Sequence, residues 1–298
     1  MTFIRHLTAL FLLIATCQIT FAADGVPTIA LPSIPDTLRT PQLRAAYLLH
    51  HFWDALDTND SVSTARLLEE NFATYATLFP IVDQEESDAA AATLLTKAQT
   101  SAGIYNETLA TAEKYLAEPL SPVYNPEAFM AFLSAVTTQR FTDDARLQRY
   151  DALLSTLSAN RPGAQCADFI IKLKGKPDTT LRGIINGIPT LLLFHDPECE
   201  DCSALISRMR TLPSLKDAIG SGNLQIVAVD LSGDEERWAA DDSHIPSEWI
   251  DAFSPNAEVL NQEIYYIPRF PSLYLINADG TVLLRDTTLE KVSEALLH

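Results

Sequence analysis

Hydrophobic residues recur at helical spacing through the first half of the chain, after residue 39. Ala46, Leu49, Trp53 and Leu56 are three or four residues apart, and the apolar positions within residues 67–75 continue the pattern. Alanine and leucine are abundant, and the only glycine between residues 39 and 158 is Gly103. The pattern predicts an all-helical domain over residues 39–160, with its later helices near residues 85–99, 102–117, 126–138 and 142–157.

The hydrophobic pattern changes after the Arg-Pro-Gly turn at residues 161–163. Mainly apolar runs, which suit strands buried on both faces, occur at residues 188–194, 224–229 and 272–276. An Asn-Ala-Asp-Gly turn then predicts a hairpin into residues 281–284. Helices are expected near residues 200–211, 234–240, 246–253, 257–263 and 288–297. This alternation predicts that residues 161–298 form an α/β sheet covered on both faces.

The N-terminus has the layout of a secretory signal peptide over residues 1–22. Arg5 supplies a positive charge, an apolar run covers residues 7–21, and the small residues Ala22 and Ala23 follow. A proline-rich, extended lead-in over residues 23–38 comes next. Lipidation at Cys17 is an alternative, and an uncleaved anchor is a weaker one because the run is short for a membrane span. We therefore expect export to the periplasm or cell envelope, with membrane contact only if Cys17 is lipidated.

Composition and charge narrow the class of partner. The chain has 298 residues, of which 47% are hydrophobic, enough for two domains with buried cores. The net charge is −18, and such a surface repels phosphate backbones, so we expect no nucleic-acid partner. The acidic residues are spread over both halves, which favours solubility. No nucleotide, haem or metal motif is visible, and we expect no cofactor.

A cysteine pair carries the candidate chemistry. Cys199 and Cys202 enclose Glu-Asp, directly after a predicted buried strand and at the start of a predicted helix. Unpaired N–H groups at a helix start stabilise a thiolate on the first cysteine, and the second, one turn inside, resolves the mixed disulfide. Pro271 precedes the strand at residues 272–276, and we predict that a cis bond there faces the substrate.

Residues 161–298 resemble the thioredoxin-like superfamily, in its branch of exported thiol-disulfide oxidoreductases. The helical part is similar to a helical domain of unknown function that precedes such domains in Gram-negative envelope proteins. The resemblance implies an α+β two-domain protein, in which an N-terminal all-helical domain is followed by a C-terminal thioredoxin-like α/β/α domain. The residues that carry it are Gly163, Ala167, Asp168, Phe169, Leu192 to Cys202, Phe270 to Ile276, Asp279 and Gly280, with Tyr47, Leu48, His51 to Asp54, Tyr115, Leu116, Ser121 and Pro122 in the helical part.

The resemblance implies that Cys199 is the nucleophile, that Cys202 resolves, and that Phe270 and Pro271 line the substrate site. Some positions depart from the family pattern. Glu198 stands where thioredoxins usually carry Trp, Leu193 replaces a buried Asp, and Phe270 replaces Thr or Val.

Four carboxylates surround the pair, on Asp196, Glu198, Glu200 and Asp201. Negative neighbours disfavour a thiolate, and strong oxidants of this fold work by stabilising one. We therefore predict a reducing or exchanging pair and not a strongly oxidising one. His195 is expected in the loop beside the pair, where it could also tune the first thiol.

Other interpretations of these residues remain open. The pair could be a structural or inactive disulfide, or half of a zinc site, although no spacing recommends His195 or His244 as further ligands. Cys166 is expected to be a free thiol near the domain boundary, with a regulatory role as the alternative. Trp238 and Trp249 are expected to cap the surface of the second domain, with a substrate-facing role as the alternative.

Two functions follow from these observations. In the first, the protein is an envelope thiol-disulfide oxidoreductase that acts on protein disulfides or dithiols and receives electrons from a redox partner. In the second, it is a non-catalytic binding or scaffold protein with a vestigial pair.

Overall fold

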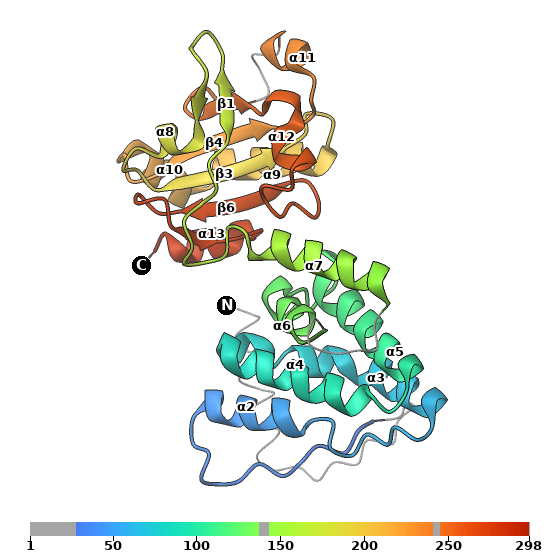
Figure 1. The fold of residues 1–298 in the computed structure, drawn as a ribbon. Helices are drawn as coiled ribbons and strands as arrows, with labels where there is room; N and C mark the ends of the chain where they lie inside the picture. Colours follow the sequence, from blue (N-terminus) through green and yellow to red (C-terminus); the bar gives the residue numbers. More distant parts are fainter. Residues whose placement is uncertain (1–27, 137–142, 241–244, 298) are drawn as a thin grey trace.

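A computed structural model describes residues 28–136, 143–240 and 245–297. Figure 1 shows a helical lobe, formed by the earlier part of the chain, and a second lobe built on a β-sheet. The predicted signal peptide, Cys17, the start of the lead-in and His244 lie outside the described residues. Within the described ranges, no helix is long and apolar enough to cross a membrane.

Side-chain caps define where the helices of the first lobe begin. Five of them start after a residue whose side chain accepts a hydrogen bond from a backbone N–H of the first turn, namely Thr40, Asp60, Asp83, Ser101 and Asp143. The elements are α2 (Pro41–His51), α3 (Ser61–Ala76), η1 (Phe79–Ile81), α4 (Gln84–Ala98), α5 (Ala102–Ala112), the π-helical turn η2 (Glu113–Ala117), α6 (Pro126–Val136) and α7 (Asp144–Ser158).

Aromatic side chains fill the centre of the helical lobe. Phe52 and Trp53 are buried with ring centroids 4.9 Å apart, and Tyr75 meets Trp53 edge-on at 5.4 Å. Phe52 and Trp53, which helical spacing and the family resemblance singled out in the sequence, therefore belong to the core of this lobe. Tyr47 is only partly buried and lies against His51, with centroids 4.4 Å apart.

The second lobe contains a seven-stranded sheet in the order β2-β1-β5-β4-β3-β6-β7. Strands β3, β4 and β5 run parallel, and β6 pairs antiparallel with β3. The elements are β1 (Ile170–Leu173), β2 (Thr179–Thr180), α8 (Leu181–Ile185), β3 (Thr190–His195), α9 (Glu200–Thr211), α10 (Pro213–Gly220), β4 (Gln225–Asp230), α11 (Glu235–Ala240), β5 (Ile250–Phe253), η3 (Pro255–Ala257), α12 (Glu258–Asn261), β6 (Ser272–Ile276), β7 (Val282–Leu284) and α13 (Leu289–Ala295).

The sheet is buried on both faces, as the apolar runs predicted. Leu192 and Phe194 of β3 join a core with α8 and α12, whereas Leu191 and Leu193 join a second core with α9, α10 and α13. Every residue of β3 is buried. The predicted fold class, a helical domain followed by a thioredoxin-like α/β/α domain, is confirmed.

One predicted element is wrong, and several were not predicted. The helix expected at residues 246–253 is instead strand β5, which pairs parallel with β4, because ladder hydrogen bonds along β4 outweigh a weak helical pattern. Strands β1 and β2 and helices α8 and α10 were not predicted. Trp238 and Trp249 are each only 7% exposed, and Trp238 stacks on Phe253 at 5.3 Å, so neither caps the surface as expected.

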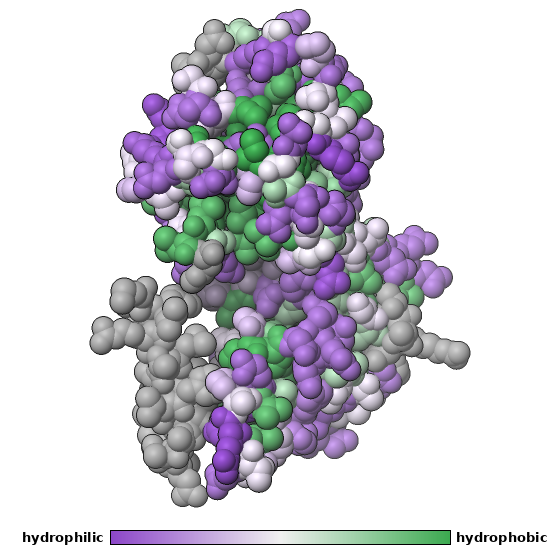
Figure 2. All heavy atoms as spheres, turned by 90° about the vertical axis from the view of Figure 1, so that its left-hand side faces the viewer, coloured by the Kyte–Doolittle hydropathy of each residue, from purple (hydrophilic) through white to green (hydrophobic). Residues whose placement is uncertain are grey.

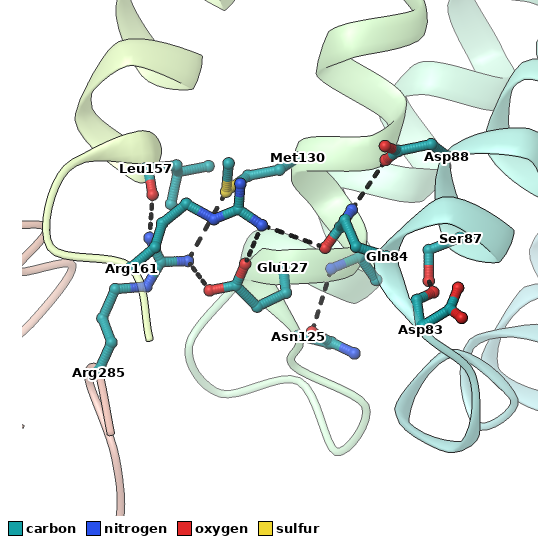
Figure 3. Close-up of polar contacts among 11 residues, drawn as sticks. Asp83, Gln84, Ser87, Asp88, Asn125, Glu127, Met130, Leu157, Arg161 and Arg285 are labelled. Carbon is teal, nitrogen blue, oxygen red and sulfur yellow. Dashed lines mark hydrogen bonds and ion pairs between the residues drawn. The ribbon is translucent and has the colours of Figure 1, made fainter. Parts of the chain in front are cut away.

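The two lobes meet through a buried arginine of the second lobe (Figure 3). Arg285 follows β7, and its Nη2 lies 2.7 Å from Glu127 Oε1 on α6. Its other terminal nitrogen donates to the carbonyl of Leu157 on α7. Arg161 approaches Glu127 at 3.3 Å from the other side. In the view of Figure 2 the lobes join at a narrower waist, and hydrophilic side chains cover much of the coloured surface of both.

Candidate functional site

Strand β3 and helix α9 position the cysteine pair. β3 ends at His195, and Cys199 is the N-cap residue of α9, so the loop between them has only three residues. Glu198 N–H donates to Asp196 Oδ1 at 2.8 Å, and Cys199 N–H donates to the Asp196 carbonyl at 3.1 Å. Asp196 thus folds the loop into a tight turn that sets the first cysteine at the helix start.

The two sulfurs lie in different environments. Cys199 is partly exposed, and its Sγ accepts a hydrogen bond from the Cys202 backbone N–H at 3.2 Å. Cys202 is fully buried. Burial, reinforced by the contact with Cys199, raises the pKa of the Cys202 thiol far above its usual range. The arrangement gives one accessible sulfur at a helix N-terminus and one protected thiol behind it.

An arginine that the sequence pattern did not single out contacts the acidic loop. Arg237 of α11 places its Nη1 2.5 Å from Glu198 Oε1 and its Nη2 3.9 Å from Asp196 Oδ1. Glu200 and Asp201 are exposed in the first turn of α9, where water screens them. Two of the four carboxylates expected to oppose a thiolate therefore have a positive partner.

His195 was expected in a loop, and this expectation is wrong. It is the last residue of β3, almost completely buried, and pairs in the parallel ladder with Asp230 of β4. The strand extends one residue beyond the apolar run, because the ladder to β4 continues to that point. The side chain therefore lies beneath the loop.

Asp230 is a buried acid that was missed in the sequence. Its Oδ1 accepts a hydrogen bond from Ser232 N–H at 2.7 Å, and its Oδ2 has no hydrogen-bond partner among the described residues. Burial raises the pKa of this carboxyl. With His195, Arg237 and neighbouring residues it lines a space of about 10 Å³, at the lower limit for one water molecule. Its position at the end of an apolar strand beside β3 was the available signal.

The register of β6 brings the predicted proline to the same end of β3. Phe194 pairs with Ser272 in an antiparallel ladder, so the preceding residue, Pro271, lies opposite His195. His195 is four residues before Cys199 in the chain. The Phe270–Pro271 peptide bond is cis, as predicted. Phe270 is partly buried and packs against the core that contains Phe194. The sheet thus brings Cys199, Cys202, Phe270 and Pro271 to one edge.

The third described cysteine, Cys166, lies 33 residues before Cys199 in the chain and before the first strand of the sheet. It is a free thiol, as expected, and is buried in the core shared with α8 and α12. Burial raises the pKa of its thiol. Across the described ranges, no three His, Cys, Asp or Glu side chains are grouped so that they could hold a metal ion.

The fold and this edge of the sheet define a thioredoxin-like domain behind a helical one. Comparison with known families agrees: residues 15–160 match a domain of unknown function, DUF5106, and residues 184–291 match a thioredoxin-like domain. The chain therefore carries a thioredoxin-like domain preceded by a helical domain of unknown function.

A solved structure has the same two-part fold, and a second one is similar over a part of the chain. A thioredoxin-like protein from Bacteroides caccae is 24% identical with a TM-score of 0.84, covering 91% of this chain and 99% of its own. The thioredoxin domain of a thiol-disulfide oxidoreductase from Bacteroides vulgatus is 17% identical with a TM-score of 0.40, covering 46% of this chain and 96% of its own. A search of curated proteins found no match.

Proposed function

We propose that this protein is a thiol-disulfide oxidoreductase of the cell envelope that reduces or exchanges disulfides in other proteins. One observation carries the proposal: an accessible Cys199 sulfur at the N-terminus of α9, backed by the buried thiol of Cys202. The match of residues 184–291 to a thioredoxin-like domain supports it.

The reaction uses both sulfurs in turn. The Cys199 thiolate attacks one sulfur of a substrate disulfide, which forms a mixed disulfide and releases the first substrate thiolate to take up a proton. Cys202 then loses its proton and attacks the Cys199 sulfur, which releases the second substrate thiol and leaves a Cys199–Cys202 disulfide. Two electrons have passed to the substrate, and a dithiol reductant restores the pair.

The residues around the pair divide the remaining work. Phe270 and Pro271 would contact the substrate chain beside the reacting sulfurs. Glu200 and Asp201 lie exposed in the first turn of α9, where their charges, weakened by water, still disfavour a thiolate on Cys199, in line with a reducing or exchanging role. His195, at the end of β3, and Glu198, in the loop before Cys199, would tune the reactivity of the pair.

Export to the periplasm or cell envelope is the location we propose, because the N-terminal sequence has the layout of a signal peptide. Such compartments permit both the formation and the exchange of disulfides.

The test is a redox titration of the chain from residue 23 onward, in dithiol buffers of graded potential, with free thiols counted at each point. We expect a reversible two-electron transition in the range of ordinary thioredoxins, about −270 mV. The variant Cys199→Ser should lose the transition with its fold intact, as judged by circular dichroism. A pair that stays oxidised in strong reductant, or that never forms a disulfide, would instead favour the scaffold interpretation.

A further inference from the structure

We propose that the helical domain positions the substrate-binding segment of the thioredoxin-like domain through a bridge from Tyr124 to Asp286 to Ser272. The inference rests on the proposed function and assigns the helical domain a part in it. Tyr124 and Asp286 are positioning residues in this scheme, because they act through the segment that ends at Pro271.

The bridge is a chain of hydrogen bonds between the lobes. Tyr124 precedes α6, and its hydroxyl donates to Asp286 Oδ2 at 2.7 Å. Ser272 Oγ donates to the other carboxylate oxygen, Oδ1, at 2.8 Å. Ser272 is the first residue of β6 and follows Pro271 directly. One carboxylate therefore connects the helical domain to the residue next to the candidate substrate site.

The backbone of Asp286 is held in an unusual conformation for this contact. Its φ is +39°, in the left-handed region that non-glycine residues rarely adopt. A glycine would occupy the position without steric cost, but it would offer no carboxylate. The aspartate therefore has a steric cost in its backbone but makes hydrogen bonds with Tyr124 and Ser272.

The segment that leads to Pro271 is fixed to the helical domain at further points. Asn160 Nδ2 donates to the Ile264 carbonyl at 2.7 Å, and Thr156 Oγ1 donates to Glu263 Oε2 at 2.7 Å. Tyr266 packs into the hydrophobic core of the helical lobe itself. Residues 263–266 thus rest on α7 and its end, and the bridge fixes the other end of the same segment at Ser272.

An open cavity lies beside the bridge. Tyr124 and Asp286 both line a cavity of about 440 Å³ between the lobes. Tyr124 packs against the hydrophobic core of the helical lobe, so Tyr124→Phe keeps that packing and loses the hydrogen bond to Asp286.

The substitutions separate connection from charge and from backbone strain. Tyr124→Phe removes only the hydroxyl. Asp286→Gly removes the carboxylate and relaxes the backbone. Asp286→Asn keeps an acceptor for Tyr124 and a donor for Ser272, and asparagine tolerates positive φ. The matched control is Tyr115→Phe, because the Tyr115 hydroxyl donates to Glu69 entirely within the helical domain.

The experiment uses the full chain from residue 23 and measures kcat and KM for insulin reduction with dithiothreitol, beside the reaction rate of the reduced pair with the small disulfide dithionitrobenzoate. We expect Tyr124→Phe and Asp286→Gly to raise the KM for insulin by about three- to tenfold, with kcat and the small-disulfide rate within about twofold of the parent. Asp286→Asn and Tyr115→Phe should stay within about twofold throughout.

Two results would overturn the inference while the proposed function stands. In the first, Tyr124→Phe and Asp286→Gly keep the parent KM for insulin. In the second, they slow the small disulfide as much as insulin, which means that the bridge supports the pair itself and not the substrate segment. If the parent chain reduces insulin no faster than Cys199→Ser, the proposed function fails, and this inference falls with it before any bridge variant is compared.

Discussion

Arg285 is the buried charge that connects the two lobes, and replacing it with methionine removes that charge while keeping an unbranched side chain. Its side chain is 1% exposed, its Nη2 lies 2.7 Å from Glu127 Oε1, and its guanidinium lies over the ring of Tyr266 at 5.8 Å. It also donates to the Leu157 carbonyl. The variant removes the arginine from both the Glu127 carboxylate and the Leu157 carbonyl.

The magnitude follows from how far each orphaned group can reach water. Removal of one partner of a buried ion pair costs about 3–5 kcal/mol. Glu127 is 33% exposed and keeps Arg161 at 3.3 Å, so it can rehydrate in part, which sets the cost at the lower end of that range. The Leu157 carbonyl adds about 1 kcal/mol. We expect Arg285→Met to lower the free energy of unfolding by about 3–4 kcal/mol.

Urea unfolding followed by circular dichroism and tryptophan fluorescence measures this loss. Trp53 reports on the helical lobe, and Trp238 and Trp249 report on the other, so a weakened interface should also separate the two transitions. The matched control is Arg208→Met, whose pair with Glu290 at 2.7 Å is 61% and 64% exposed and should cost under about 0.5 kcal/mol.

A double-mutant cycle isolates the ion pair. Arg285→Met combined with Glu127→Gln should be less destabilising than the sum of the single changes by at least about 1 kcal/mol, because the second change removes the orphaned charge. The reasoning is refuted if Arg285→Met costs no more than Arg208→Met, or if the cycle shows no coupling.

Three further outcomes are expected for the cysteine pair and for two residues near it, Arg237 and Asp230. In the reduced, folded chain from residue 23 at pH 8, iodoacetamide should label Cys199 alone, since burial raises the pKa of both Cys202 and Cys166. Mass spectrometry showing two or three rapid additions would contradict this. Arg237→Met should slow that labelling at pH 7 by about two- to fivefold, because two carboxylates beside the thiol lose their counter-charge, and an unchanged rate would remove the arginine from the site. Burial raises the folded-state pKa of Asp230, so the protonated carboxyl contributes stability below the unfolded pKa of about 3.9, and this contribution is lost as the pH rises through the folded value. Asp230→Asn should therefore be more stable than the parent at pH 7 but not at pH 3. An equal difference in stability at both pH values would argue against a titrating group.

The fold and the pair were predictable because their signals are local. The apolar run of β3, the spacing of Cys199 and Cys202 and the position of Pro271 all lie within short stretches of sequence. A wholly apolar run shorter than a helix suits a buried strand, and α9 begins within one residue of the first cysteine.

The remaining parts of the site depend on contacts between distant residues. Tyr124 and Asp286 are 162 residues apart, and neither carries a pattern that distinguishes it from any surface tyrosine or aspartate. Arg237 reaches the acidic loop only because β4 lies beside β3 and α11 follows it. Strand β5 is short, and its partner strand decides its conformation.

The chain passes between the lobes at Asn160, without a flexible linker. This residue follows the end of α7 with φ of +55°, is 3% exposed, and binds both Ile264 and the Ala167 N–H through its amide. A swing of the lobes about this point would strip both hydrogen bonds from a buried amide, at a cost of about 1–3 kcal/mol for each group left unsatisfied. Under the proposed function, reaction with a partner protein therefore does not depend on separation of the two lobes. Its disulfide reacts with the partly exposed Cys199 while the two lobes stay in contact.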